Sequence, residues 1–272
     1  MRIAVTAPSC RLPEAAAERV RALAAAEFPD VELVFHPQCF LSDGHFAGPD
    51  AARAAAFVDC ANDPDFDALW FARGGYGSNR ALEGILPRLT DAARAKTYLG
   101  YSDAGFLLGA LYAAGIGTVA HGPMPGDINR DGGAAAVRRS LAWLATRDPA
   151  SVEASVDGAT PAVAFNLTIL SHLLGTPWAP DLSGHVLMLE EVGEYMYRID
   201  RALFHLTSDP MIRRVAGLKL GRCSDIPPND PDFVRSEQQI AEEWCARAGI
   251  AWLGRADIGH DIDNKLVPFG RT

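Results

Sequence analysis

The chain has 272 residues, of which 49% are hydrophobic and 22% are charged, and its net charge is −9. This length is enough for one large domain or two small ones, each with a buried core. The acidic balance and the lack of a basic stripe argue against nucleic acid or an anionic membrane as a partner. Apolar runs stop well short of the roughly 20 residues that a membrane span needs. The N-terminal stretch MRIAVTAPSC has no signal-peptide hydrophobic region, so we expect a cytoplasmic protein.

The first half of the chain alternates strand-like and helix-like segments joined by short links. Strand patterns cover 2–8, 31–36, 67–75, 96–102 and 115–123, and helical patterns cover 13–28, 50–63, 78–89 and 103–115. Such alternation predicts an α/β fold with a parallel, helix-flanked sheet, which binds ligands beyond the carboxyl ends of its strands.

In the second half of the chain the order of helical and strand patterns changes. A polar, turn-rich stretch around an Ala/Arg helix separates it from the first half and is interpreted as a connector. Helical patterns then cover 166–175, 198–209 and 232–249, and strand patterns cover 185–192, 215–223 and 251–260. We therefore predict an N-terminal domain over 1–125, a connector over 126–164 and a smaller α/β domain over 165–272.

Three glycine-rich stretches fall at predicted strand ends of the first domain: ARGGYGSNR (72–80), GYSD (100–103) and HGPM (121–124). Loops that follow parallel strands converge, so these stretches are candidates for a single site. The alternative is that the glycines only make tight turns.

Ser102 lies in GYSDAG, which is similar to the nucleophile elbow G-x-S-x-G except that the second glycine, Gly105, comes one position late. In such an elbow a strand turns sharply into a helix, and the helix start offers N–H groups to a developing oxyanion. The alternative is that Ser102 or Asp103 simply caps the helix. The fragment by itself leaves both interpretations open.

A serine nucleophile needs a base and a group that orients the base. Among the seven histidines, His121 lies in HGPM, close to the other candidate site loops, and His260 lies in the polar loop IGHDIDN after a predicted strand. Glu190 follows the apolar run HVLML, where a catalytic acid or a solvated strand end would fit equally well. No cluster of His, Cys, Asp or Glu has convincing ligand spacing, and the five cysteines form no C-x-x-C pair, so no metal and no cofactor are expected.

Taken in order, these fragments form a set that resembles the LD-carboxypeptidase family of serine peptidases, which also includes the microcin C self-immunity proteins. The resemblance is carried by APS (7–9), RGGYGSNR (73–80), GYSD (100–103), HGPM (121–124), NL (166–167) with LLGTP (173–177), LEEVGEYMYRIDR (189–201) and IGHDIDNKLVPFG (258–270). It extends along nearly the whole chain. It implies a flavodoxin-like N-terminal sheet, a smaller C-terminal domain and an active site in the cleft between them.

The resemblance also implies a catalytic Ser-His-Glu triad. Position by position, Ser102 matches the nucleophile, Glu190 the triad acid and His260 the base. The backbone N–H of Asp103 and that of Gly74 or Gly75 would match the oxyanion hole. For substrate binding we single out Arg73, Tyr76 and Tyr101; a guanidinium such as that of Arg73 can bind a carboxylate with two hydrogen bonds, although structural pairing would explain it equally well.

The reaction implied by the family is hydrolysis of the amide between the L-centre of meso-diaminopimelate and the terminal D-alanine of murein tetrapeptide. A cytoplasmic chain would fit the recycling of such peptides, and a homodimer is what the family suggests. Two departures stand out: Ala164-Phe165-Asn166 replaces the usual Gly-Gly-Asn and is expected to reshape the site wall, and the sequence after the histidine loop is short.

Two other functions stay open at this point. The first is an immunity-type hydrolase of peptidyl or acyl nucleotides, which would need a flat aromatic side chain such as Trp178 or Trp252 to stack on the base. The second is a ligand-binding protein of the same fold that performs no catalysis.

Overall fold

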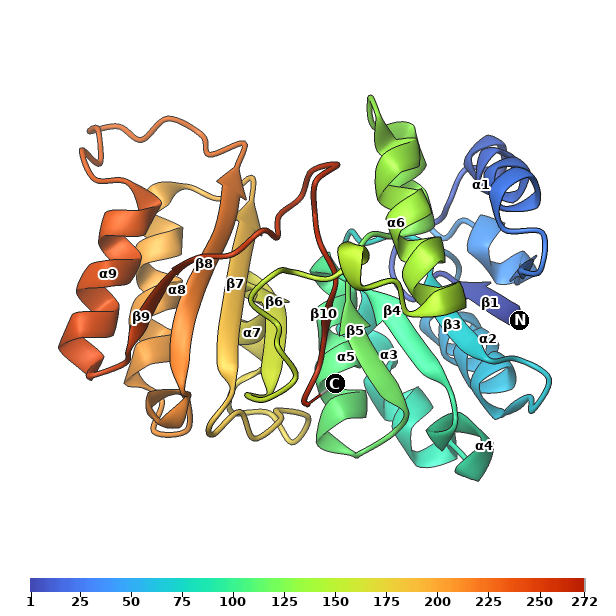
Figure 1. The fold of residues 1–272 in the computed structure, drawn as a ribbon, viewed down its shortest axis with the longest axis horizontal. Coiled ribbons are helices and arrows are strands. Elements are labelled where there is room, and N and C mark those ends of the chain that lie inside the picture. The colour runs from blue at the N-terminus through green and yellow to red at the C-terminus, as the bar shows by residue number, and fades with distance from the viewer. Residues whose placement is uncertain (272) are drawn as a thin grey trace.

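The structure is a computed structural model that describes residues 1–271, and it contains two sheets that lie side by side (Figure 1). The larger sheet has six strands in the order β10-β5-β4-β3-β1-β2, and the smaller has four in the order β6-β7-β8-β9. The strands are β1 (Arg2–Thr6), β2 (Glu32–Phe35), β3 (Ala68–Phe71), β4 (Thr97–Gly100), β5 (Thr118–His121), β6 (Ala162–Asn166), β7 (Val186–Val192), β8 (Gly217–Ser224), β9 (Trp252–Arg255) and β10 (Val267–Pro268). The α-helices are α1 (Glu14–Glu27), α2 (Asp50–Asn62), α3 (Ser78–Ile85), α4 (Asp91–Arg94), α5 (Gly105–Ala113), α6 (Gly133–Thr146), α7 (Leu167–Leu173), α8 (Met196–Ser208) and α9 (Glu237–Ala248).

Alternation along the strands sorts their side chains onto two faces of the larger sheet. In β3, Ala68 and Trp70 belong to one apolar cluster, whereas Leu69 and Phe71 belong to another. Helices α1 and α6 pack on the first face, and α2, α3 and α5 pack on the second (Figure 1). Because both faces are covered, every residue of β3 is buried, as is typical of a central strand in a parallel sheet.

Strands β2-β1-β3-β4-β5 of the larger sheet run parallel in the flavodoxin-like order. The order reverses between β1 and β3, and doubly wound sheets bind ligands at such a point, beyond the carboxyl ends of their strands. The predicted α/β fold, a flavodoxin-like sheet followed by a smaller α/β unit, is confirmed.

The smaller sheet joins the larger unit through helix packing. Its four strands are parallel, and α7, α8 and α9 cover one of its faces. Helix α7 approaches α5 closely at two glycines: a Cβ on Gly105 would lie 3.0 Å from Ile169 Cγ2, and one on Gly109 would lie 2.5 Å from Leu173 Cδ2. The late glycine of GYSDAG therefore serves the contact between the two units.

Two strands lie outside the predicted elements. Strand β6 begins in the predicted connector and extends past its end. Its run AVAFN is short and entirely buried, so it has no alternating pattern that would predict a strand. Strand β10 has two residues and pairs antiparallel with β5, so the C-terminal segment returns to the larger sheet. The boundary predicted at residue 165 thus lies inside β6, and α6 of the predicted connector packs on the larger sheet through Val137 and Leu141.

None of the helices formed by residues 1–271 combines the length and the apolar character needed to cross a bilayer.

Candidate active site

Ser102 lies at a sharp turn between β4 and α5. Its backbone has φ of 59°, a left-handed conformation that is uncommon for a residue with a side chain. Residues 102–104 form a single 3₁₀ turn before α5 begins at Gly105. The hydroxyl of Ser102 does not cap this turn or the helix; instead its Oγ lies 2.9 Å from His260 Nε2. This geometry matches the elbow interpretation rather than the helix-cap interpretation.

Asp103 has a capping role, but for a different helix from the one that follows it. Its buried carboxylate accepts hydrogen bonds from the hydroxyl of Ser9 and from the backbone N–H groups of Gly77 (3.3 Å) and Ser78 (2.9 Å). Burial raises the pKa of Asp103, and these hydrogen bonds oppose that rise. Asp103 therefore caps the start of α3 and ties together the loops that follow β1, β3 and β4.

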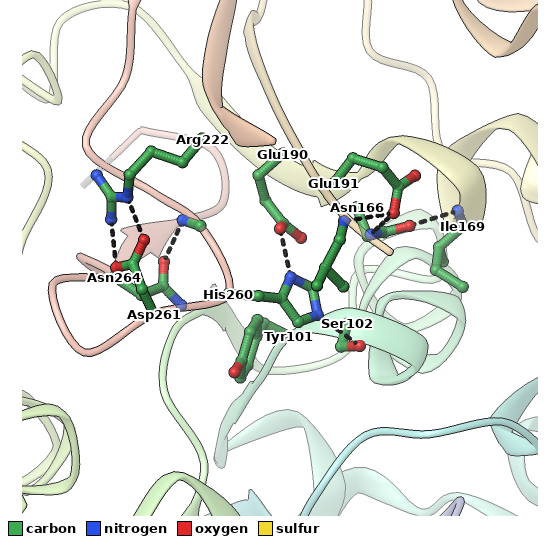
Figure 2. Close-up of polar contacts among 12 residues, drawn as sticks. Tyr101, Ser102, Asn166, Ile169, Glu190, Glu191, Arg222, His260, Asp261 and Asn264 are labelled. Atoms are coloured by element: carbon green, nitrogen blue, oxygen red, sulfur yellow. Dashed lines mark hydrogen bonds and ion pairs between the residues drawn. The ribbon is translucent and has the colours of Figure 1, made fainter. Parts of the chain in front are cut away.

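The structure brings the three residues of the expected triad into one series of contacts (Figure 2). His260 Nδ1 lies 2.5 Å from Glu190 Oε2, and His260 Nε2 faces the Ser102 hydroxyl on the other side of the ring. A carboxylate only accepts hydrogen bonds, so Nδ1 carries the proton and Nε2 presents a lone pair to the serine. Glu190 comes from β7, and His260 comes from the loop between β9 and β10.

The electrostatics of the site favour a basic imidazole. Glu190 is fully buried, and His260 is 8% exposed. Burial lowers the pKa of His260, but the charge and hydrogen bond of Glu190, together with the charges of Glu191 and Asp127, hold that pKa above its ordinary value. Glu190 Oε1 has no hydrogen-bond partner within residues 1–271. The hydrogen bond of this carboxylate to a side chain is therefore the one that Oε2 accepts from His260.

The second acid of LEE has a structural role. The buried Glu191 carboxylate accepts hydrogen bonds from Asn166 Nδ2 (2.7 Å) and from Thr168 N (2.9 Å). Asn166 in turn caps α7 by accepting a hydrogen bond from Ile169 N at 3.1 Å (Figure 2). Burial raises the pKa of Glu191. This network joins the end of β7 to the start of α7, next to Glu190.

The loop that carries His260 is held by Arg222, a residue of β8. Two nitrogens of its guanidinium donate to the carboxylate of Asp261 (Figure 2). The guanidinium also donates to Asp257 Oδ1 at 2.6 Å. These two carboxylates lie on either side of His260 in the sequence. The loop is therefore clamped by charged side-chain contacts.

Asn264 supports the same loop from inside. It is fully buried, and its Oδ1 accepts a hydrogen bond from Gly259 N at 3.1 Å and lies 3.3 Å from His121 Nε2. Burial lowers the pKa of His121 to about 4, so this imidazole is neutral near pH 7. His121, the other candidate base, thus supports the His260 loop and does not contact Ser102.

A cavity of about 340 Å³ opens beside the Ser102 hydroxyl. It is lined by Arg73, Gly74, Gly75, Tyr101, Ser102, Met124, Gly126, Asp127, Asn129, Arg130 and His260. Gly74 lies against the serine so closely that a Cβ at this position would be 2.9 Å from Ser102 Oγ. Of the predicted oxyanion-hole residues, Gly74 and Gly75 line the cavity, whereas the Asp103 side chain points away into the loop network.

The predicted substrate-binding residues divide into two groups. Arg73 and Tyr101 line the cavity, with the Tyr101 ring 4.8 Å from the His260 ring and its hydroxyl donating to Asp127 Oδ1 at 2.8 Å. Tyr76 is 48% exposed, packs near His45 and does not line the cavity.

The residues of the unusual AFN segment and the two candidate tryptophans also lie away from the cavity. Ala164 and Phe165 are buried in the apolar core and do not form the cavity wall, contrary to expectation. Trp178 and Trp252 pack against the core of the smaller unit and are not among the cavity-lining residues.

Four residues that shape the site were not predicted: Asp127, Arg130, Arg222 and Asn264. Asp127 and Arg130 lie in PGDINR directly after HGPM, and a polar loop after a strand end was the signal that could have identified them. Asn264 lies within IGHDIDN itself. No local signal marks Arg222, since its partners are 35 and 39 residues away in the sequence.

Within residues 1–271, no group of His, Cys, Asp or Glu side chains is arranged to hold a metal ion. The arrangement at Ser102 suits nucleophilic chemistry: a hydroxyl with a base, a buried acid behind the base and glycine backbone beside the oxygen.

Comparison with known proteins agrees with this arrangement. A family model described as the LD-carboxypeptidase N-terminal domain matches residues 3–122, and one described as the LD-carboxypeptidase C-terminal domain matches residues 161–272. A protein of Streptomyces coelicolor described as a carboxypeptidase is 34% identical, covering 99% of this chain and 88% of its own. The murein tetrapeptide carboxypeptidase of Pseudomonas aeruginosa is 29% identical, covering 84% of this chain and 78% of its own.

Solved structures share the same two-sheet architecture. The muramoyltetrapeptide carboxypeptidase from Oxalobacter formigenes has a TM-score of 0.80 and 25% identity, covering 99% of this chain and 93% of that chain. The microcin C7 self-immunity protein MccF has the same fold, with a TM-score of 0.78 and 19% identity over 100% of this chain and 96% of that chain. Since the two family models together match most of the sequence, the chain belongs to the LD-carboxypeptidase family of serine peptidases.

Proposed function

We propose that this enzyme hydrolyses the amide between the L-centre of meso-diaminopimelate and the terminal D-alanine of murein tetrapeptide, in the cytoplasmic recycling of peptidoglycan. Ser102 is the nucleophile, His260 the base and Glu190 the residue that orients the base. The observation that carries the proposal is the series of contacts from Glu190 Oε2 through the His260 ring to Ser102 Oγ, which opens on a cavity. The substrate class follows the relatives named as murein tetrapeptide carboxypeptidases.

The first half of the proposed reaction forms an acyl-enzyme. His260 Nε2 accepts the Ser102 proton as Oγ attacks the carbonyl of the scissile amide. The buried Glu190 carboxylate stabilises the imidazolium that forms and holds the ring in one tautomer. The imidazolium then gives its proton to the leaving nitrogen, and D-alanine departs.

The second half regenerates the enzyme. His260, neutral again, accepts a proton from a water molecule that attacks the ester carbonyl, and it returns that proton to Ser102 Oγ. Negative charge develops on the carbonyl oxygen in both halves. We propose that the backbone N–H of Asp103 and that of Gly74 or Gly75 stabilise this charge, because Asp103 directly follows the serine and the two glycines line the cavity beside it.

The immunity-type alternative finds less support in the site. It needs an aromatic ring to stack on a nucleotide base, and Trp178 and Trp252 both pack against the core of the smaller unit and do not line the cavity. The likeness to MccF is a likeness of fold. A binding protein without catalysis would not need a serine at a φ of 59° facing a histidine, since that conformation costs roughly 1–3 kcal/mol.

The decisive experiment measures free D-alanine by mass spectrometry after incubation with murein tetrapeptide. Ser102→Ala should lower kcat by at least about 10³-fold, as expected for loss of a nucleophile, while circular dichroism stays unchanged. Ser208→Ala removes an exposed hydroxyl from α8 and is the matched control. If wild-type protein releases no D-alanine and Ser102 is not labelled by a fluorophosphonate probe, the proposal is wrong.

A further inference from the structure

Two guanidinium groups line the cavity beside Ser102, and they are held differently. Arg73 follows β3, is exposed and makes no ion pair within residues 1–271. Arg130 follows the loop after β5, and its side chain is 41% exposed. The lining also holds one carboxylate, that of Asp127, so the two guanidinium groups leave the cavity with an excess of positive charge, which predicts a substrate with negative charge near its reacting end.

Asp127 fixes the position of Arg130. The Arg130 Nε donates to Asp127 Oδ1 at 3.1 Å, and the 6%-exposed carboxylate also accepts from Tyr101 Oη and from Met124 N, each at 2.8 Å. Within residues 1–271, the Arg130 guanidinium makes its hydrogen bond through Nε. Its two terminal nitrogens therefore form a free edge, and such an edge binds a carboxylate with two parallel hydrogen bonds.

The same contacts relate Arg130 to the reacting atoms. Tyr101 precedes Ser102 in the sequence, and its ring lies 4.8 Å from the His260 ring while its hydroxyl holds Asp127. The guanidinium is thus fixed to the nucleophile and to the base through one buried tyrosine. Backbone contact strengthens this link, because Gly126 N donates to Ala72 O at 2.8 Å at the end of β3.

Substrate chemistry supplies the matching anion. In a peptide cleaved at its last amide, the terminal carboxylate is three bonds from the scissile carbonyl carbon, on the leaving-group side. In a cavity of about 340 Å³ that holds Ser102 and His260, this carboxylate is the negative group nearest to the bond that breaks. A cation fixed before the substrate arrives binds it without loss of side-chain freedom.

We infer that Arg130 binds the terminal carboxylate of the residue that leaves, and that this contact restricts the enzyme to the last amide of a peptide. The inference rests on the proposed function and names the group that selects the cleavage position.

The test compares murein tetrapeptide with the same peptide amidated at its terminal D-alanine. Wild type prefers the free acid, and Arg130→Gln lowers the ratio of kcat/KM for acid over amide by about 10- to 100-fold, the loss typical of a charged hydrogen-bonded pair. Arg130→Lys keeps the positive charge but cannot form two parallel hydrogen bonds, so its acid-to-amide ratio lies between those of wild type and Arg130→Gln. Arg138→Gln is the matched control: it alters an exposed guanidinium that pairs with Glu27 and does not line the cavity, and its ratio equals that of wild type.

Each other result overturns the inference. If Arg130→Gln lowers kcat/KM for both peptides by the same factor, Arg130 supports the fold of the site and does not bind the carboxylate. If Arg73→Gln changes the ratio and Arg130→Gln does not, the carboxylate lies on Arg73. If wild type hydrolyses neither peptide, the proposed function fails and the inference fails with it, whereas in the first two cases the proposed function stands.

Discussion

Ser102 and His260 come from two regions that are 158 residues apart in the sequence and are built on different principles. The Ser102 turn is fixed mainly by its backbone. Ser102 has a left-handed φ, Gly74 packs against its side chain, and the buried carboxylate of Asp103 accepts hydrogen bonds from nearby backbone N–H groups. The His260 loop has no strand or helix of its own around the histidine. Charged and amide side chains, chiefly Arg222 and Asn264, hold it in place.

This difference shows how one active site can be assembled from two sheets. Ser102 is positioned by local sterics, which act over a few residues and leave little freedom to move. His260 is positioned by long-range polar contacts, which depend on charge and on the approach of β8 to the loop. We therefore expect added volume to damage the serine side and altered charge to damage the histidine side.

The largest effect should come from Glu190→Gln. An amide cannot stabilise the imidazolium or enforce its tautomer, so kcat should fall by about 10³- to 10⁴-fold. In wild type, kcat/KM should rise with pH as His260 loses its proton, around a pKa held above the ordinary value by Glu190. In the variant, burial acts without the carboxylate, so the inflection should move to lower pH.

The pH profile of kcat/KM measures this shift. Glu194→Gln alters a carboxylate that pairs with Arg198 on the surface, and it should leave the inflection in place. An unchanged inflection in Glu190→Gln would contradict the role assigned to that residue.

A smaller loss is expected from Gly74→Ala on the serine side. The added Cβ would lie 2.9 Å from both Cβ and Oγ of Ser102, so the hydroxyl must move away from His260. A displacement of this size should lower kcat by about 10²-fold. Steady-state kinetics with a thermal melt would separate activity from stability.

Gly44→Ala is the control for this substitution. Its Cβ would meet nothing within 4 Å, but its φ of 57° makes the variant less stable without touching the site. Normal kcat in Gly74→Ala would show that the serine is not held by this contact.

The smallest effect should come from Arg222→Ala on the histidine side. The loop loses its contacts to Asp257 and Asp261 but keeps those of Asn264, so kcat should fall by about 10-fold with KM nearly unchanged. Arg222→Lys restores part of the charge and should recover part of the rate.

Arg138→Ala removes an ion pair with Glu27 far from the loop and should not change kcat. If Arg222→Ala behaves like this control, or if only KM changes, the clamp does not position His260.

The sequence predicted the regular elements well where their patterns were long. The five parallel strands β1–β5 of the larger sheet and the helices α1, α2, α3, α5, α7, α8 and α9 agree with the predicted ranges to within a few residues, whereas α6 was expected without bounds and the short α4 was not expected. The failures were β6 and β10, one wholly buried and one only two residues long, which carry no periodic signal. Asp103 shows a different kind of failure. Its position suggested a cap for α5. In the structure its carboxylate instead accepts hydrogen bonds from the backbone N–H groups at the start of α3, because the loops after β3 and β4 lie side by side.

By itself, the sequence determined the family and named Ser102, Glu190 and His260 as candidates, because those positions carry short, ordered motifs. The tertiary structure alone decided that these side chains meet, since a serine, an acid and a histidine from distant segments acquire a common geometry only when the two sheets pack together. It also decided which contacts Asp127, Arg222 and Asn264 make. Each of them has a partner on a segment distant in the sequence, and the sequence does not specify which distant side chains will meet.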